Sequence, residues 1–212
     1  MPSPTYFSIF SLPPHLVIDT AALEKSFYAL SRRLHPDRFA SKSPAEQAAA
    51  LAESSRLNDA YRTLRDPIAR TEYLLELEGV QLEEQSSAAT AAARASGTQK
   101  KQVVPEDLLE EAFELNMQLE EMRAAKKMAA LGDPDESADP QLRRDLESAK
   151  SDFDAKLAAT NATLAQLHTQ WDQAYDAADP AAKSATIDAM VALLNRRSYL
   201  RNLVRDVNDA LE

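Results

Sequence analysis

The stretch from Phe27 to Phe39 constrains the fold most, because it ends an amphipathic segment at the tripeptide His35-Pro36-Asp37. Apolar residues before it recur at the 4-3-4 spacing of one helical face, at Leu23, Phe27, Leu30 and Leu34. Pro36 has no backbone N–H to donate and biases His35 away from helical geometry. The helix over 20–34 is therefore predicted to stop at or just before His35, leaving the tripeptide in a loop.

A second amphipathic segment begins at Ser43-Pro44-Ala45-Glu46, which has the form of a capping box with proline at the first helical position. Its apolar side can pack on the first helix, so the two segments are predicted to form an antiparallel hairpin. His35, Pro36 and Asp37 would lie at the exposed tip of that hairpin. Basic residues flank the tripeptide: Lys25, Arg32, Arg33 and Arg38.

Charge is unevenly distributed along the chain. The 24 basic and 34 acidic residues give a formal charge of 24 − 34 = −10, which argues against general nucleic-acid binding. Residues 20–40 are instead net positive, because four cations outweigh Glu24 and Asp37. A basic hairpin on an acidic protein indicates an acidic protein partner, and the alternative is an ordinary solvated face.

Composition predicts an all-α protein. Three glycines stand against eleven prolines, and β-branched runs are nearly absent. The chain contains no cysteine, so it offers no disulfide, thiolate nucleophile or cysteine-ligated metal centre. Its three histidines lack metal-ligand spacing, so neither a metal site nor a cofactor is expected. We expect no enzyme activity, no membrane span and a cytoplasmic location.

Proline and glycine divide the chain into two helical regions. Short helices over 6–12 and 68–78 flank the hairpin and complete a first domain, 1–80. The small residues of 85–101 predict a flexible linker within 81–104, or alternatively an alanine-rich helical extension. Three long helices, starting at Pro105, at Asp139-Pro140 and at Asp179-Pro180, are expected to form an antiparallel bundle over 105–212. We expect His15 to be solvated in a loop and His168 to be structural.

The helix that starts at Pro105 has more apolar residues than one packing seam needs. Leu109, Phe113 and Met117 form a second stripe, about 100° round the helix from the stripe that begins at Leu108. Carboxylates flank this second stripe at Glu110, Glu114, Glu120 and Glu121. The stripe either is exposed and binds a partner with an apolar contact and a basic rim, or belongs to a wide core.

Three motifs together resemble a J-domain. They are Y-F-S-I-F-S-L-P at 6–13, H-P-D-R-F at 35–39 and N-D-A-Y-R-T-L-R-D-P at 58–67. In particular the chain resembles HscB, the J-protein co-chaperone of iron–sulfur cluster assembly, specifically from Tyr6 to Gly79 and more weakly beyond. The resemblance implies a J-domain over 1–80 followed by a client-binding bundle.

That family's activity implies a co-chaperone without catalysis of its own. It would stimulate ATP hydrolysis by a DnaK/HscA-class chaperone and deliver an IscU-type scaffold to it, supporting iron–sulfur protein maturation. The basic helix would steer the J-domain onto the chaperone, and the tripeptide would contact it. Two alternatives remain: a J-domain co-chaperone that recruits a different client, and a non-enzymatic helical adaptor.

The resemblance also implies a scaffold-binding face on the helix that starts at Pro105. Met117 stands where a carboxylate is expected on this face, and Glu110 stands where an apolar residue is expected. The zinc module with its cysteines, found in some eukaryotic relatives, is missing. The candidate scaffold-binding residues are Leu109, Phe113, Glu114, Met117, Glu121 and, from the last helix, Tyr199.

Overall fold

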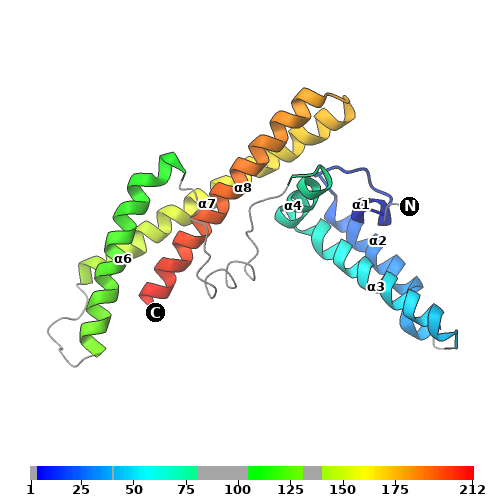
Figure 1. Ribbon diagram of the computed structural model, residues 1–212, viewed down its shortest axis with the longest axis horizontal. Helices are drawn as coiled ribbons and strands as arrows, with labels where there is room; N and C mark the ends of the chain where they lie inside the picture. Colours follow the sequence, from blue (N-terminus) through cyan, green and yellow to red (C-terminus); the bar gives the residue numbers. More distant parts are fainter. Residues whose placement is uncertain (1–3, 40, 81–104, 131–139) are drawn as a thin grey trace. The chain divides into compact units, whose positions relative to one another are not determined.

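A computed structural model describes residues 4–39, 41–80, 105–130 and 140–212 (Figure 1). These residues contain helices and no strand, which confirms the expected all-α fold. The first group of elements is α1 (Tyr6–Ile9), α2 (Thr20–Arg33), η1 (Pro36–Phe39), α3 (Pro44–Arg65) and α4 (Pro67–Leu77). The second group is η2 (Glu106–Leu108), α6 (Leu109–Ala130), α7 (Pro140–Asp176) and α8 (Pro180–Leu211).

The contacts divide the chain into two compact units. One contains Met1–Glu83 together with Gln166–Ile187, and the other contains Glu84–Ala165 together with Asp188–Glu212. The end of α7 and the start of α8 thus group with the N-terminal helices. The division into 1–80, 81–104 and 105–212 stays a prediction, and the expected linker lies outside the described residues.

Helix α1 is shorter than the 6–12 expected from the sequence. Phe10 already caps it, and Ser11 has a left-handed backbone with φ 56°. The Leu12 N–H then donates to the Phe7 carbonyl at 2.9 Å, in the manner of a Schellman turn. The helix therefore ends at Ile9, before the Leu12 expected from the sequence.

A carboxylate of α7 holds the segment between α1 and α2. Asp172 accepts hydrogen bonds from the backbone N–H groups of Leu16 (2.6 Å) and Val17 (2.9 Å). The neighbouring Trp171 is fully buried and donates its indole N–H to the Pro14 carbonyl at 2.9 Å. These bonds attach the backbone of the segment to α7 on both sides of the half-buried His15.

His15 lies in a loop, as expected, but it is half-buried and has a partner on α7. Its Nε2 lies 2.9 Å from Asp176 Oδ1, and its ring meets Tyr175 edge-on at 5.6 Å. The same interactions that anchor Leu16 and Val17 bring this residue against the end of α7. A histidine flanked by Pro14 and Leu16 gives no sequence signal for a partner 161 positions away.

His168 is structural, as expected. It is buried on α7, with its Nε2 2.7 Å from the Thr71 hydroxyl oxygen on α4. The Thr71 hydroxyl donates to the Pro67 carbonyl at 2.7 Å, so the imidazole must donate to Thr71 through Nε2–H. Burial and the nearby Arg70 guanidinium lower the pKa of His168 from 6.5 to about 4.

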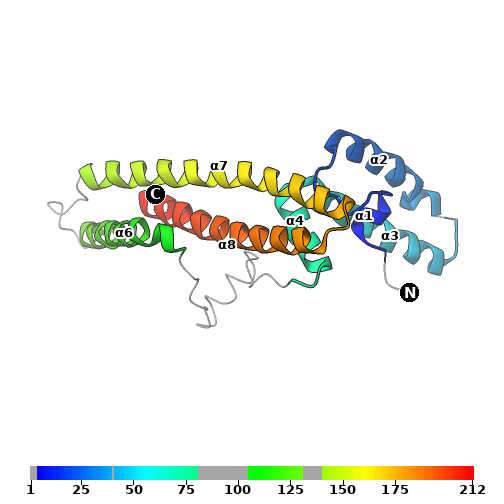
Figure 2. The same cartoon turned by 90° about the horizontal axis from the view of Figure 1, so that it is seen from above.

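The second unit is built around one apolar core that η2, α6, α7 and α8 share. Helices α7 and α8 lie side by side in opposite directions (Figure 2). Leu115, Leu119 and Met122 of α6 pack in the same cluster as Leu146 and Phe153 of α7. Leu200, Leu203 and Val207 of α8 complete it. This arrangement agrees with the antiparallel packing that the three apolar stripes predict.

The lowered pKa of His168 predicts a loss of stability in acid. In the unfolded chain this side chain takes up a proton near pH 6.5, whereas in the folded protein it does so only near pH 4. The free energy of unfolding should therefore fall between these values as the pH decreases, by about 1–2 kcal/mol at pH 5. Urea unfolding at pH 7.5 and pH 5 should show a smaller decrease for His168→Gln, and equal decreases would contradict the assignment.

Candidate functional site

The tripeptide lies at the turn between α2 and α3. Helix α2 ends at Arg33, and Leu34 caps it with an N–H bonded to the Leu30 carbonyl at 3.0 Å. The chain then forms η1, in which the Arg38 N–H donates to the His35 carbonyl at 3.0 Å. The tripeptide was expected to lie in a loop, and the structure gives that loop a short 3₁₀ turn.

Helix α3 begins where the capping box predicts. The Ser43 side chain accepts a hydrogen bond from the Glu46 N–H, and the Glu46 carboxylate accepts one from the Ser43 N–H at 3.0 Å. The hydrogen bonds from Ser43 lower the pKa of Glu46, so the box is formed with an ionised carboxylate. The turn between the helices is therefore defined on both sides, by Pro36 and by this cap.

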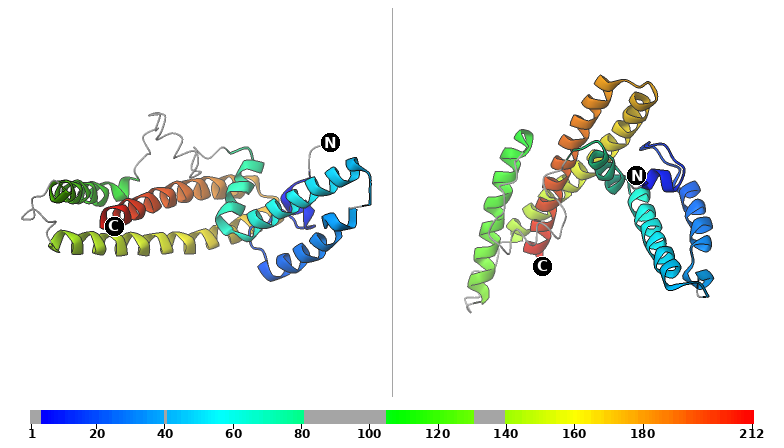
Figure 3. Two further views of the ribbon diagram at one scale, coloured as in Figure 1. Left: turned by 90° about the horizontal axis from the view of Figure 1, so that it is seen from below. Right: turned by 45° about the vertical axis from the view of Figure 1, so that its right-hand side comes forward.

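Aromatic and apolar contacts hold α2 against α3. Phe27 stacks on Tyr61 with ring centroids 4.2 Å apart and an interplanar angle of 14°. Leu23 of α2 and Leu57 and Leu64 of α3 are buried. The views in Figure 3 show the two helices side by side and joined at the turn. The hairpin predicted from the sequence thus places His35 at its tip, where this residue is exposed.

The predicted basic residues lie on the outer surface of this hairpin. Lys25, Arg32, Arg33 and Arg38 are all exposed. Tyr28, which the sequence analysis did not single out, is 54% exposed between them, and its carbonyl accepts a 3.4 Å hydrogen bond from Arg32 Nε. Tyr28 comes three positions after Lys25 and four before Arg32, and this helical spacing is the sequence signal that places it on the same face. The side chains of Pro36 and Asp37 lie outside the described part of the site.

The second predicted site is the apolar stripe on α6, and it is exposed. The exposed fractions are 52% for Leu109, 69% for Phe113 and 61% for Met117. The buried residues of this helix are others: Ala112, Leu115, Leu119 and Met122. The wide-core interpretation of the stripe is therefore wrong, because the bundle uses only one face of α6.

Carboxylates line one edge of this exposed stripe. Glu110, Glu114 and Glu121 are exposed, and within the described residues none of them has an ion-pair partner. Tyr199 does not join the stripe. It is only 8% exposed and belongs to the core of the second unit, where burial raises the pKa of its phenol. Its role in scaffold binding stays a prediction, and the phenol is not part of the exposed surface.

Sequence reasoning missed two ion pairs at the start of α6. Asp107 contacts Arg196 of α8, and Glu111 contacts Lys156 of α7. The sequence analysis gave neither carboxylate a partner. Asp107 and Glu111 are four residues apart, so both lie on one side of the helix. This spacing was the sequence signal that the two carboxylates form similar contacts with neighbouring helices.

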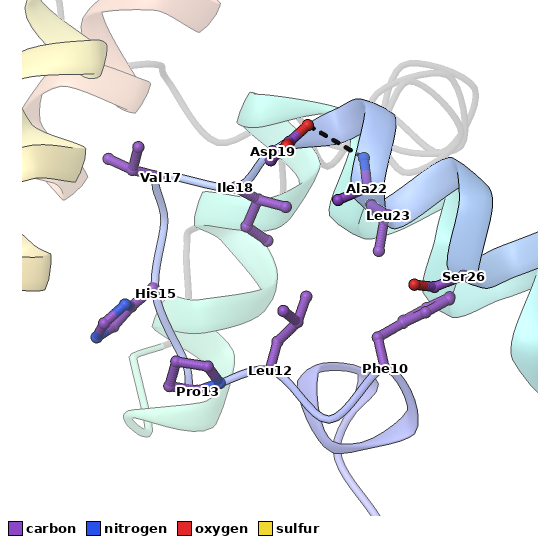
Figure 4. Close-up of a pocket in the computed structure, with 10 residues that line it drawn as sticks. All are labelled: Phe10, Leu12, Pro13, His15, Val17, Ile18, Asp19, Ala22, Leu23 and Ser26. Carbon is purple, nitrogen blue, oxygen red and sulfur yellow. Dashed lines mark hydrogen bonds between the residues drawn. The ribbon is translucent and has the colours of Figure 1, made fainter.

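An apolar pocket of about 160 Å³ lies between α1, the segment after it and α2 (Figure 4). Phe10, Leu12 and Leu23 are among the residues that line it. Asp19 uses its carboxylate to cap α2 by accepting from the Ala22 N–H, and the His15 ring points away from Phe10 and Leu12. None of the predicted site residues lines this pocket. Among the described residues, no group of three His, Cys, Asp or Glu is placed to hold a metal ion.

No protein-family model matches the sequence. A co-chaperone protein HscB homolog from Bordetella petrii is 46% identical over 89 residues, which cover 42% of this chain and 52% of the relative. Chaperone HscB from Vibrio cholerae is a solved structure with 31% identity and a TM-score of 0.56, and the match covers 98% of this chain and 99% of that one. The protein belongs to the HscB co-chaperone family.

The relatives differ from this chain in length and in sequence identity. The chain spans about half the length of the curated relatives it matches, 52% for the Bordetella petrii protein. The match with human HscB covers 98% of this chain and 82% of the human chain with a TM-score of 0.55. At 22% identity it supports the fold and nothing further.

None of the described helices is long and apolar enough to cross a membrane.

Proposed function

We propose that this HscB-family protein stimulates ATP hydrolysis by a DnaK/HscA-class chaperone and delivers an IscU-type scaffold to it, in support of iron–sulfur protein maturation. The observation that carries the proposal is the position of His35 at the tip of the α2–α3 hairpin, among exposed cations. No hydrolytic step is assigned to this chain. Its contribution is to bind two proteins, and the cytoplasmic location stays a prediction.

The basic surface of α2 supplies long-range attraction. Lys25, Arg32 and Arg33 are exposed on one helix of an otherwise acidic protein, so their field is directed outward from the hairpin. Complementary charge raises the rate of encounter with an acidic surface and orients the approach. These residues are therefore assigned to docking, and their contribution should weaken as salt screens it.

The tip of the hairpin supplies the contact that changes the chaperone. A co-chaperone can shift the chaperone toward its hydrolysing state only if it binds that state more tightly than the other. His35 offers exposed polar groups for such a contact, and the proline after it fixes the local backbone. The capped turn means that little ordering of the tip is needed on binding.

The exposed stripe of α6 is assigned to the scaffold. Leu109, Phe113 and Met117 offer an apolar contact, and Glu110, Glu114 and Glu121 offer charge at its edge. This combination suits a partner whose apolar patch has a basic rim. Holding the scaffold on the same chain as the hairpin raises its effective concentration at the chaperone.

Substitutions in the hairpin should separate docking from activation. We expect His35→Gln to leave helix content and the melting temperature unchanged while it abolishes the increase in ATPase rate, because the exposed side chain contributes little to packing. The matched variant Arg32→Gln/Arg33→Gln should instead raise the concentration needed for half-maximal stimulation several-fold and keep the maximum. ATPase titrations measure both quantities. A His35→Gln protein with full maximal stimulation would remove the tripeptide from the mechanism.

Truncation of the stripe should affect binding and not folding. Leu109→Ala/Phe113→Ala should weaken scaffold binding about tenfold or more, since aromatic and aliphatic anchors dominate such interfaces. Its free energy of unfolding should change by less than about 0.5 kcal/mol per residue. The control Leu115→Ala, in the core, should lose about 2–5 kcal/mol.

Isothermal titration with the IscU-type scaffold and urea unfolding test this pair of expectations. Stimulation of the chaperone by the double variant alone should remain intact. Unchanged scaffold affinity in the double variant would leave the J-domain assignment in place and favour a different client.

A further inference from the structure

The start of α6 lacks the side-chain cap that other helices of this protein have. Pro105 precedes η2 and makes no side-chain capping bond, whereas Ser43 and Asp66 cap α3 and α4. An uncapped first turn frays more easily than a capped one. Leu109, the first residue of the exposed stripe, lies immediately after η2. Its position is therefore fixed by contacts other than a helix cap.

Two ion pairs hold this turn from two different helices. Asp107 is bound by Arg196 of α8, and Glu111, one turn later, is bound by Lys156 of α7. Arg196 and Lys156 share a pocket of about 220 Å³, which places the two cations on the same part of the surface. The hydrogen bond from Arg196 is the main cause of a lowered pKa for Asp107, so the pair stays charged at neutral pH.

The register of these contacts fixes which side of α6 faces outward. Phe113 comes two positions after the bound Glu111, which is about 200° round the helix, and Leu109 lies one turn before Phe113 on the same side. Ion pairs that draw Asp107 and Glu111 toward α7 and α8 therefore keep Leu109 and Phe113 directed away from them. Glu110 and Glu114 come three positions after the bound carboxylates and lie between the two sides, without ion-pair partners among the described residues.

We infer that Arg196 and Lys156 are positioning residues of the scaffold-binding face: they order the first turn of α6 and present Leu109 and Phe113 to the partner. The inference rests on the proposed function. Neither cation is expected to touch the scaffold, because each is occupied by its own carboxylate. They act through Asp107 and Glu111.

The test compares Arg196→Gln/Lys156→Gln with a control of equal charge, Arg143→Gln/Lys150→Gln, whose cations pair with Glu147 and Asp154 inside α7. Both variants make the protein more acidic, which by itself favours a partner with a basic rim. We expect Arg196→Gln/Lys156→Gln to bind the scaffold about three- to tenfold more weakly, because two partly exposed ion pairs contribute only a small free energy. The control should bind at least as well as wild type. Thermal melting should stay within a few degrees in both.

Two readouts separate positioning from a general structural effect. Hydrogen exchange in the free protein should speed up at the amides of 109–113 and remain unchanged over Leu119 and Met122, which keep their places in the core. In a double-mutant cycle, Arg196→Gln should have no further effect once Asp107→Asn is present. Additive effects of these two substitutions would mean that Arg196 acts on the partner directly.

The outcomes distinguish this inference from the proposed function. If wild-type protein binds the scaffold and Arg196→Gln/Lys156→Gln binds equally well with unchanged exchange, the positioning role is wrong and the proposed function stands. If wild-type protein does not bind the scaffold, the proposed function fails. Exchange at 109–113 would then still decide whether the ion pairs order the turn.

Discussion

Three helices of this protein, α3, α4 and α8, begin with a capping side-chain oxygen followed by a proline at the first helical position. Ser43-Pro44 and Asp66-Pro67 begin α3 and α4 in this way, and Asp179 accepts from the N–H groups of Ala181 and Ala182 at the start of α8. Each start forces one helix to end and the next to begin within a few residues. Short turns between long helices favour antiparallel packing, so this constraint places His35 at an exposed tip.

The hairpin could be predicted from the sequence because its determinants are local. The end of α2 near Pro36, the capping box at Ser43 and the shared apolar face all follow from residue type and spacing. The exposed stripe on α6 was only half predictable. Periodicity identifies a second apolar stripe at Leu109 and Phe113, but the packing of α7 and α8 decides that it is exposed.

Long-range polar contacts could not be predicted in the same way. The bonds that the amides of Leu16 and Val17 donate to Asp172, and the contact of His15 with Asp176, join residues more than 150 positions apart. The chain has many carboxylates, and the sequence around any one of them does not indicate which distant residue it binds. Tyr199 was placed on the scaffold-binding face by the resemblance to the HscB family, and only packing shows that this side chain is buried.

The two proposed binding surfaces differ in what holds them. The turn of the hairpin is bounded by a proline and a full capping box, and both belong to the hairpin itself. The first turn of α6 has no such cap and is held by Asp107 and Glu111 through charges on neighbouring helices. Substitutions in α7 or α8 should therefore change the shape of the second surface more readily than that of the first.

The central claim is that one chain links a chaperone and its scaffold client. Steady-state ATP hydrolysis by the HscA-type chaperone tests it most directly, measured with this protein alone, with the IscU-type scaffold alone and with both together. The account predicts a rate with both that clearly exceeds the sum of the separate increases, because the tethered client reaches the chaperone at high effective concentration. A rate no greater than that sum would contradict delivery of this client, and no stimulation of any DnaK-class chaperone would contradict the co-chaperone activity itself.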